Sequence, residues 1–246
     1  MGKGLAIRWA AKHDVIIGSR NYDRAKSTAK ELYNMTKSFY QGEMKGSIDG
    51  DTNSAIVRES EVIVVTLPSE ATIPTLRELK GQFRSGQIIV SVVVPMERRG
   101  KLFRVTSFTS DGMGAKSAAE VVQEFVWPCP VVSGFHTVPA ACLIDMASIL
   151  EIDVFMAGNN DQAISTVSKL AQDIPNIRPL KVGPLEDSKW LEALTPLLLN
   201  TAILNNLHDP AVRIIHGHQH RARQLLRLPR HSVRYGSVAS MDTKIG

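Results

Sequence analysis

Short runs of β-branched residues alternate with amphipathic stretches along the first 182 residues, and this alternation is the feature that most constrains the fold. Helical periodicity occupies residues 22–40, 53–59, 71–80, 116–127 and 161–173. Between these stretches lie short, nearly continuous apolar runs of the kind found in buried parallel strands, at residues 15–19, 62–67, 88–93, 131–133, 152–157 and 179–182. Strands that alternate with helices are typical of a parallel sheet covered by helices. The sequence therefore predicts a doubly wound, mainly parallel α/β domain at residues 1–182.

The pattern changes after Gly183 and Pro184, where one long helical segment at residues 186–206 replaces the alternation. The segment is rich in leucine, and its apolar residues occupy too many sides for a solvated surface helix. We expect it to pack into a domain or subunit interface, and a homodimer is the expected assembly. Residues 183–215 are interpreted as a small C-terminal helical part.

Residues 216–246 are interpreted as a basic, disordered tail outside both parts. They carry six Lys and Arg residues against Asp242 alone, which equals the whole net charge of +5. They also lack the spaced large apolar residues of a core element. A nucleic-acid arm and a metal site at His216, His218 and His220 remain alternatives. Because Tyr235 is the only aromatic residue there, base stacking has little to use, and we expect no nucleic-acid partner and no metal.

Several protein classes are excluded by what the chain lacks. No apolar run approaches the roughly 18 residues that a membrane span needs. The apolar start is interrupted by Arg8 and Lys12, unlike a signal peptide. Cys129 and Cys142 are the only cysteines, too few for a zinc knuckle or a disulfide framework. We expect a cytoplasmic protein with no membrane partner and with both cysteines buried as apolar residues.

The chain opens on a glycine turn that runs directly into a helix, Met1-Gly2-Lys3-Gly4, and a strand pattern follows at residues 13–20. In a Rossmann-type domain a strand and a G-x-G-x-x-G loop precede the first helix, whose N-terminus holds the pyrophosphate of a dinucleotide. If Gly2 is the last glycine of such a loop, the first strand and most of the loop lie upstream of Met1. We therefore interpret the domain as a Rossmann-type domain without its first strand.

The end of the strand at residues 15–19 indicates which dinucleotide binds. An acidic residue there would hydrogen-bond the free ribose hydroxyl of NAD, whereas Ser19 and Arg20 offer a hydroxyl and a guanidinium suited to a 2′-phosphate. Arg24, in the first turn of the next helix, either adds a second cation or is a solvated surface residue. The sequence favours NADP as the cofactor.

Five stretches together resemble the coenzyme F420-dependent NADP oxidoreductases: GKGLAIRWA, DVIIGSR, VIVVTLP, VVSGFHTVPAA and LEALTPLLLN. The resemblance extends from Gly2 to about residue 215. It implies a Rossmann-type domain with a smaller helical part, and reversible hydride transfer between NADP(H) and an 8-hydroxy-5-deazaflavin, coenzyme F420. The family's opening strand and loop are absent here, which a start assigned at an internal methionine would explain. The tail is a further departure, explained by an altered reading frame or a lineage-specific extension.

The resemblance also implies roles for individual residues. Ser19, Arg20 and Arg24 match positions that bind the 2′-phosphate, and Arg24 stands where the family often has a lysine. Leu67 and Val94 match strand ends that contact the dinucleotide, and Gly134 lies near the nicotinamide. The deazaflavin maps to His136, Thr137, Thr195 and Pro196. For His136 the alternative is a histidine bonded into its own loop, and for Thr195 and Pro196 it is a packing kink at a subunit interface.

Direct hydride transfer between two rings needs proximity, alignment and exclusion of water rather than a nucleophile or a general base. No G-x-S-x-G or H-E-x-x-H motif is present, and we expect no catalytic side chain. Two alternatives stay open. One is an NADPH-dependent reductase of another acceptor, an imine or a metal ion, and the other is a non-catalytic binding module without a pyrophosphate loop.

Overall fold

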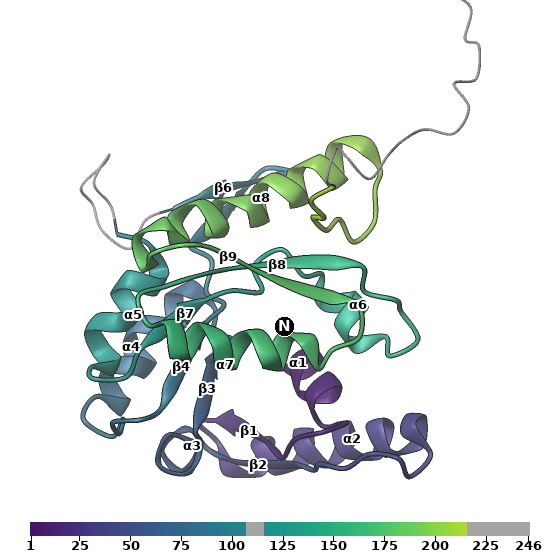
Figure 1. Cartoon of the computed structure of the whole chain (residues 1–246), viewed down its shortest axis with the longest axis vertical. Helices are drawn as coiled ribbons and strands as arrows, with labels where there is room; N and C mark the ends of the chain where they lie inside the picture. Colours follow the sequence, from purple (N-terminus) through teal and green to yellow (C-terminus); the bar gives the residue numbers. More distant parts are fainter. Residues whose placement is uncertain (107–115, 216–246) are drawn as a thin grey trace, which may run out of the picture. The chain divides into compact units, whose positions relative to one another are not determined.

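The computed structural model describes residues 1–106 and 116–215, so the predicted tail at residues 216–246 lies outside the described residues. The chain divides into a unit from Met1 to Arg213 and a second unit from Ile214 onward. The helices and strands discussed below belong to the first unit (Figure 1). The predicted boundary between residues 182 and 183 stays a prediction.

The helices and strands follow the predicted alternation closely. The helices are α1 (Gly2–Trp9), α2 (Tyr22–Tyr40), α3 (Asn53–Glu59), α4 (Ser69–Leu79), α5 (Ala118–Val126), α6 (Ala140–Ile144), α7 (Asp161–Gln172) and α8 (Ser188–Asn205). The strands are β1 (Val15–Ser19), β2 (Ile48–Thr52), β3 (Val62–Val65), β4 (Ile88–Ser91), β5 (Met96–Arg99), β6 (Leu102–Val105), β7 (Val131–Ser133), β8 (Ile152–Gly158) and β9 (Ile177–Gly183). Within the described residues, no helix is long and apolar enough to cross a membrane.

Five of the strands form one sheet in the order β3-β4-β7-β8-β9. Adjacent strands of this sheet run parallel to each other, except that β7 and β8 are antiparallel. β1 and β2 form a separate parallel pair, and β5 and β6 form an antiparallel hairpin. The predicted mainly parallel sheet is confirmed, and the reversed direction of β8 is a feature that its apolar run did not reveal.

Helices pack on both faces of the five-stranded sheet because successive strand residues point to opposite sides. Val90 and Val132 pack in one cluster with residues of α1 and α7, whereas Ile89 and Val131 pack in a second cluster with residues of α4 and α5. A third cluster joins α1 to α2 and β2. The doubly wound prediction is therefore confirmed.

Polar side chains begin four of these helices at residues that local chemistry favours, and Thr52 accepts the Ala55 N–H at the start of α3. The Asn21 and Asn160 side chains accept hydrogen bonds from the first turns of α2 and α7. Ser117 forms a capping box with Glu120 at the start of α5. These caps fix where the chain turns from loop into helix.

Within the described residues, β1 pairs with β2 alone and β3 pairs with β4 alone. Each of the two strands therefore has one edge with unused backbone hydrogen-bonding groups. The expectation that a further strand lies upstream of Met1 stays a prediction.

Four short elements were not predicted: β2, β5, β6 and α6. β2 reads as a loop because it contains Asp49, Gly50 and Asp51, yet Gly50 is required there because a Cβ would lie 2.3 Å from the Ala25 carbonyl oxygen of α2. The β5–β6 hairpin is rich in arginine and turns at Gly100, which has a φ of 62°. Its two strands are stabilised by pairing with each other rather than by burial, so they lack the apolar pattern by which strands are predicted from sequence.

Candidate active site

A cavity of about 610 Å³ opens where β3 and β4 end, which is where ligands bind in open α/β sheets. It is lined by the end of β3, the end of β4, the segment after β7, the middle of α8 and the chain after α8. The lining residues are Met1, Thr66, Leu67, Pro68, Ser69, Glu70, Val92, Val94, Met96, His136, Thr137, Val138, Pro139, Ala140, Ala141, Thr195, Leu198, Leu199, Asp209 and Pro210.

The first turn of α1 lies directly against the end of β3. A Cβ on Gly2 would lie 2.6 Å from Thr66 Oγ1, so any larger residue would force the Thr66 side chain or one of the two segments to move. The first hydrogen bond of α1 runs from the Leu5 N–H to the Met1 carbonyl at 3.1 Å. The preceding N–H groups have no partner inside the helix, and they carry the positive end of its dipole. This is a suitable cradle for a phosphate, because Gly2 adds no side chain of its own between the helix and the strand end.

His136 is buried in the cavity wall, and neither of its ring nitrogens has a hydrogen-bond partner among the described residues. Burial lowers its pKa from 6.5 to about 4, and the nearby Val93 carbonyl opposes this only partly. The ring is therefore neutral at physiological pH, with one N–H donor and one acceptor nitrogen. Both ring nitrogens are themselves buried, so His136 meets the cavity through its other atoms and presents an uncharged surface to a ligand.

The remaining residues predicted to meet the deazaflavin have structural partners. Thr195 Oγ1 on α8 donates a 2.8 Å hydrogen bond to the His136 carbonyl, so Thr195 ties α8 to the segment that carries His136. Thr137 also lines the cavity, and its hydroxyl donates to the Asp153 carbonyl at 3.4 Å. Pro196 is buried on α8 and is not among the residues that line the cavity.

Leu67 and Val94 line the cavity as predicted, whereas Gly134 does not. A Cβ on Gly134 would make ordinary contact with Met156 at 3.5 Å and with the Phe155 carbonyl at 3.6 Å, both on β8. Gly134 therefore faces the neighbouring strand. Its predicted proximity to the nicotinamide stays a prediction that the cavity lining does not support.

The cavity carries two carboxylates and no lysine or arginine among its lining residues. Glu70 lies in the first turn of α4, and Asp209 lies in the chain that follows α8. The sequence analysis missed both, together with Thr66. Thr66 could have been predicted together with its neighbour Leu67, because both lie at the end of the same strand. Asp209 could not, because only the path of the chain after α8 brings it to the cavity.

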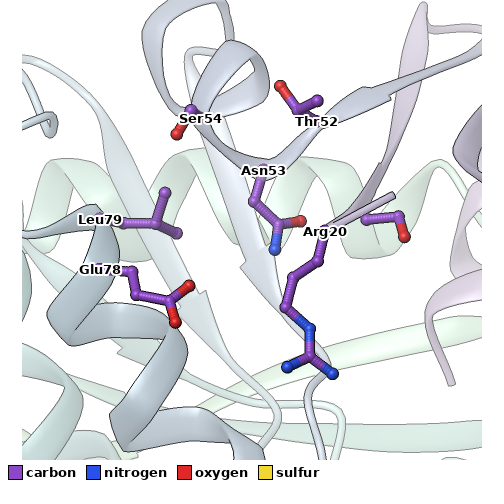
Figure 2. Close-up of a pocket in the computed structure, with 7 residues that line it drawn as sticks. Arg20, Thr52, Asn53, Ser54, Glu78 and Leu79 are labelled. Carbon is purple, nitrogen blue, oxygen red and sulfur yellow. The ribbon is translucent and has the colours of Figure 1, made fainter. Parts of the chain in front are cut away.

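A smaller pocket of about 220 Å³ lies at the carboxyl end of β1 and β2. Ser19 and Arg20 line it as predicted, and Arg24 does not. Thr52, Asn53 and Ser54 come from the junction of β2 and α3, and Glu78 and Leu79 come from α4 (Figure 2).

The polar groups of this pocket fit a phosphate monoester. Ser19 Oγ accepts the Asn21 N–H at 3.1 Å, which leaves its own hydrogen free to donate. Arg20 extends into the pocket beside Asn53 in Figure 2, and it has no ion-pair partner within the described parts of the chain. Glu78 supplies the one opposing charge. An unpaired guanidinium next to a free hydroxyl suits a 2′-phosphate better than a ribose hydroxyl.

The chain is similar to known proteins over most of its length. A family model described as NADP oxidoreductase, coenzyme F420-dependent, matches residues 1–95. The F420-dependent NADP reductase of Methanocaldococcus jannaschii is 34% identical over 214 residues, covering 87% of this chain and 92% of that protein. The F420-dependent NADP reductase of Methanothermobacter marburgensis is 30% identical over 216 residues, with coverage of 87% and 92%.

Solved structures support the fold. A crystal structure from Arthrobacter sp. FB24, assigned as an F420-dependent NADP reductase, superposes with a TM-score of 0.68 at 17% identity and covers 87% of this chain and 96% of that one. Together with the sequence matches, the cavity at the ends of β3 and β4 and the Ser19–Arg20 pocket agree with the resemblance that the sequence suggested. The chain belongs to the family of coenzyme F420-dependent NADP oxidoreductases.

Proposed function

We propose that this protein transfers a hydride between NADP(H) and the deazaflavin coenzyme F420. The observation that carries the proposal is the large cavity at the ends of β3 and β4, whose largely apolar lining suits a flat ring. The relatives named above are F420-dependent NADP reductases, and the family membership of the chain supports the same pair of co-substrates.

NADP supplies the nicotinamide carbon that donates or accepts the hydride, and the chain's own residues bind and align. We assign the 2′-phosphate to Ser19 and Arg20, and the pyrophosphate to the first turn of α1 at Gly2. Leu67 and Val94 offer apolar contacts where β3 and β4 end. Arg24 is exposed on α2 and contributes at most long-range attraction, because it does not line the pocket.

His136 and Thr137 are assigned to the deazaflavin. His136 stays neutral, so it contributes an uncharged contact to the cavity wall and exchanges no proton in the reaction. Thr195 holds the His136 backbone and acts as a positioning residue. A direct hydride transfer needs alignment of the two rings and exclusion of water, so the proposed reaction requires no nucleophile from the cavity lining.

The test is oxidation of NADPH by the purified protein, followed by absorbance, with and without F420. We expect turnover only when F420 is present. Turnover with an imine or a metal ion instead would replace the acceptor, and no turnover with any acceptor, together with no binding of NADPH, would refute the enzymatic assignment.

Cofactor choice is tested by Arg20→Gln, with Arg24→Gln as the matched control. Losing one charge-assisted contact at an exposed site should weaken NADPH binding by about 1 to 2 kcal/mol while NADH binding changes little. The control should change NADPH binding by less than about 0.5 kcal/mol. Equal losses for NADPH and NADH in the Arg20 variant would contradict the assignment of the phosphate pocket.

We also propose that the protein is a homodimer that uses the exposed face of α8. Trp190, Leu197 and Leu204 follow one another at intervals of seven residues, and their exposed fractions are 65%, 59% and 68%. Apolar residues at this spacing lie along one side of a helix, and a stripe of this kind can pair with its own copy about a two-fold axis. Leu197→Glu should shift the sedimentation equilibrium toward the monomer, and a wild-type protein that is monomeric at high concentration would refute the proposal.

A further inference from the structure

The β5–β6 hairpin is a strongly cationic element beside the cavity. Its two strands and turn contain Arg98, Arg99, Lys101 and Arg104, against Glu97 as the only acidic residue. All four basic side chains are exposed. The function assigned above makes no use of them.

The register of the hairpin places Arg98 on the same face as a cavity residue. Met96 pairs with Val105 and Arg98 pairs with Phe103, so these four side chains share one face of the ribbon. Met96 lines the cavity, and Arg98 lies two residues further along, at a spacing of roughly 7 Å. Arg99 projects from the opposite face, where it forms an ion pair with Glu97.

The Arg98 side chain is partly held and still free to bind. Its Nε donates to the Gly100 carbonyl at 3.2 Å, and its guanidinium carbon lies 6.0 Å from the centre of the Phe103 ring. The two terminal amino groups have no hydrogen-bond or ion-pair partner among residues 1–106 and 116–215. An oriented guanidinium with two free amino groups is suited to phosphate and carboxylate oxygens.

The side chain of Asn200 on α8 bonds to the backbone of the hairpin. Asn200 Oδ1 accepts the Phe103 N–H at 2.7 Å, and Asn200 Nδ2 donates to the Phe103 carbonyl at 2.8 Å. The preceding residues of α8, Leu198 and Leu199, line the cavity. The side chain of Asn200 thus pairs with β6 as another strand would, and it keeps Arg98 at the border of the cavity.

The charges of the cavity and the hairpin are complementary to two different parts of one ligand. Apart from the N-terminal turn of α1, which is assigned to the pyrophosphate, the cavity has no lysine or arginine in its lining, and Glu70 and Asp209 are acidic, so the rest of it suits an uncharged ring better than an anionic chain. Coenzyme F420 joins a flat deazaflavin ring to a flexible side chain that ends in a phosphodiester and glutamate carboxylates. When the ring occupies the cavity, the anionic chain has to leave it, and the hairpin offers cations at its border.

We propose that the β5–β6 hairpin, with Arg98 as its principal contact, binds the acidic side chain of coenzyme F420. The proposal rests on the hydride-transfer function proposed above. It assigns to the hairpin a choice of substrate, because a deazaflavin with the acidic chain would bind more tightly than the same ring without it.

The experiment compares Arg98→Gln with wild type on three co-substrates: F420, F420 without its glutamates, and the deazaflavin without phosphodiester or glutamates. Both KM from NADPH oxidation and Kd from deazaflavin fluorescence titration are measured. For F420 we expect KM and Kd to rise about 3- to 10-fold in the variant, as for a partly exposed charge-assisted contact. Three quantities should stay within about twofold of wild type, because they involve no contact with Arg98. They are kcat, the KM of NADPH, and the KM and Kd of the ring without its acidic chain.

The intermediate compound identifies which anion is bound. An effect that persists without the glutamates assigns the contact to the phosphodiester, and an effect that disappears assigns it to the carboxylates. Arg99→Gln is the matched control on the opposite face of the hairpin, and it should change the KM of F420 by less than about twofold. Added salt should raise the Kd of F420 in wild type more steeply than in Arg98→Gln.

Two results would overturn the proposal while leaving the hydride-transfer function intact. One is an unchanged KM and Kd for F420 in Arg98→Gln. The other is an equal loss for F420 and for the ring without its acidic chain, which would mean that the hairpin shapes the ring site instead. Absence of NADPH oxidation and of fluorescence change with every deazaflavin, in the wild-type protein, would refute both proposals together.

Discussion

Glu192 makes the attachment of α8 sensitive to pH. Its side chain is 2% exposed, and its two carboxylate oxygens accept the N–H groups of Ala118 at 2.9 Å and Ala119 at 3.1 Å, at the start of α5. Burial raises its pKa from 4.5 to about 7, with a small contribution from Glu120, although the two backbone donors act in the opposite direction. A carboxyl group that is half protonated near neutral pH thus joins α8 to the N-terminus of α5.

The sign of the effect follows from the raised pKa. The folded state holds the Glu192 proton more tightly than the unfolded chain does, so its contribution to stability is fully present below pH 4.5 and is lost as the pH rises through about 7. The difference between the two pKa values corresponds to up to about 3 kcal/mol of unfolding free energy. Glu192→Gln is neutral at every pH and removes this dependence.

The assay is urea unfolding of both proteins, followed by circular dichroism, at intervals from pH 4.5 to pH 8. We expect the unfolding free energy of wild type, relative to that of Glu192→Gln, to fall by about 3 kcal/mol across this range. Glu186→Gln is the control, because Glu186 lies exposed in the turn before α8 and its variant should follow wild type. Parallel pH profiles for wild type and Glu192→Gln would refute the reasoning.

Three further predictions concern α1 and the cavity. Arg8 is buried and donates to five backbone carbonyls of residues 142–148. Arg8→Lys cannot supply the planar guanidinium, so it should lower the unfolding free energy by about 2 to 4 kcal/mol in thermal melts. A change below about 1 kcal/mol would contradict this. Because the pKa of His136 is about 4, its ring stays neutral from about pH 5.5 to pH 8, and the pH profiles of kcat for wild type and His136→Asn should be parallel over this range. An inflection near pH 6.5 (the ordinary pKa of histidine) that is present only in wild type would show that the ring titrates in turnover. Gly2→Ala should raise the KM of NADPH through its contact with Thr66 Oγ1, and adding Thr66→Ala should restore much of the loss, whereas additive losses would place the cause elsewhere.

Local sequence determined most of the secondary structure and one part of the site. The β-branched runs and the helical periodicity depend on neighbours within about one turn or one strand, and the strands and helices that they predict appear in the structure close to the expected positions. Ser19 and Arg20 could be identified from the sequence because they lie directly at the end of a predicted strand. The family resemblance added residues that lie far apart in sequence, and the cavity brings together five of them: Leu67, Val94, His136, Thr137 and Thr195.

Other features depend on contacts between residues that are distant in the chain, and only the tertiary structure decided them. Arg8 breaks an apolar pattern in the sequence, yet it is buried because the carbonyls of residues 142–148 surround it. Glu192 resembles a surface residue of a helix until α5 supplies its two N–H donors from 74 and 73 residues away. The β5–β6 hairpin needs Asn200 of α8, and no local propensity signals that partner. A buried polar group is stable only where its partners meet it, and the fold as a whole decides where they meet.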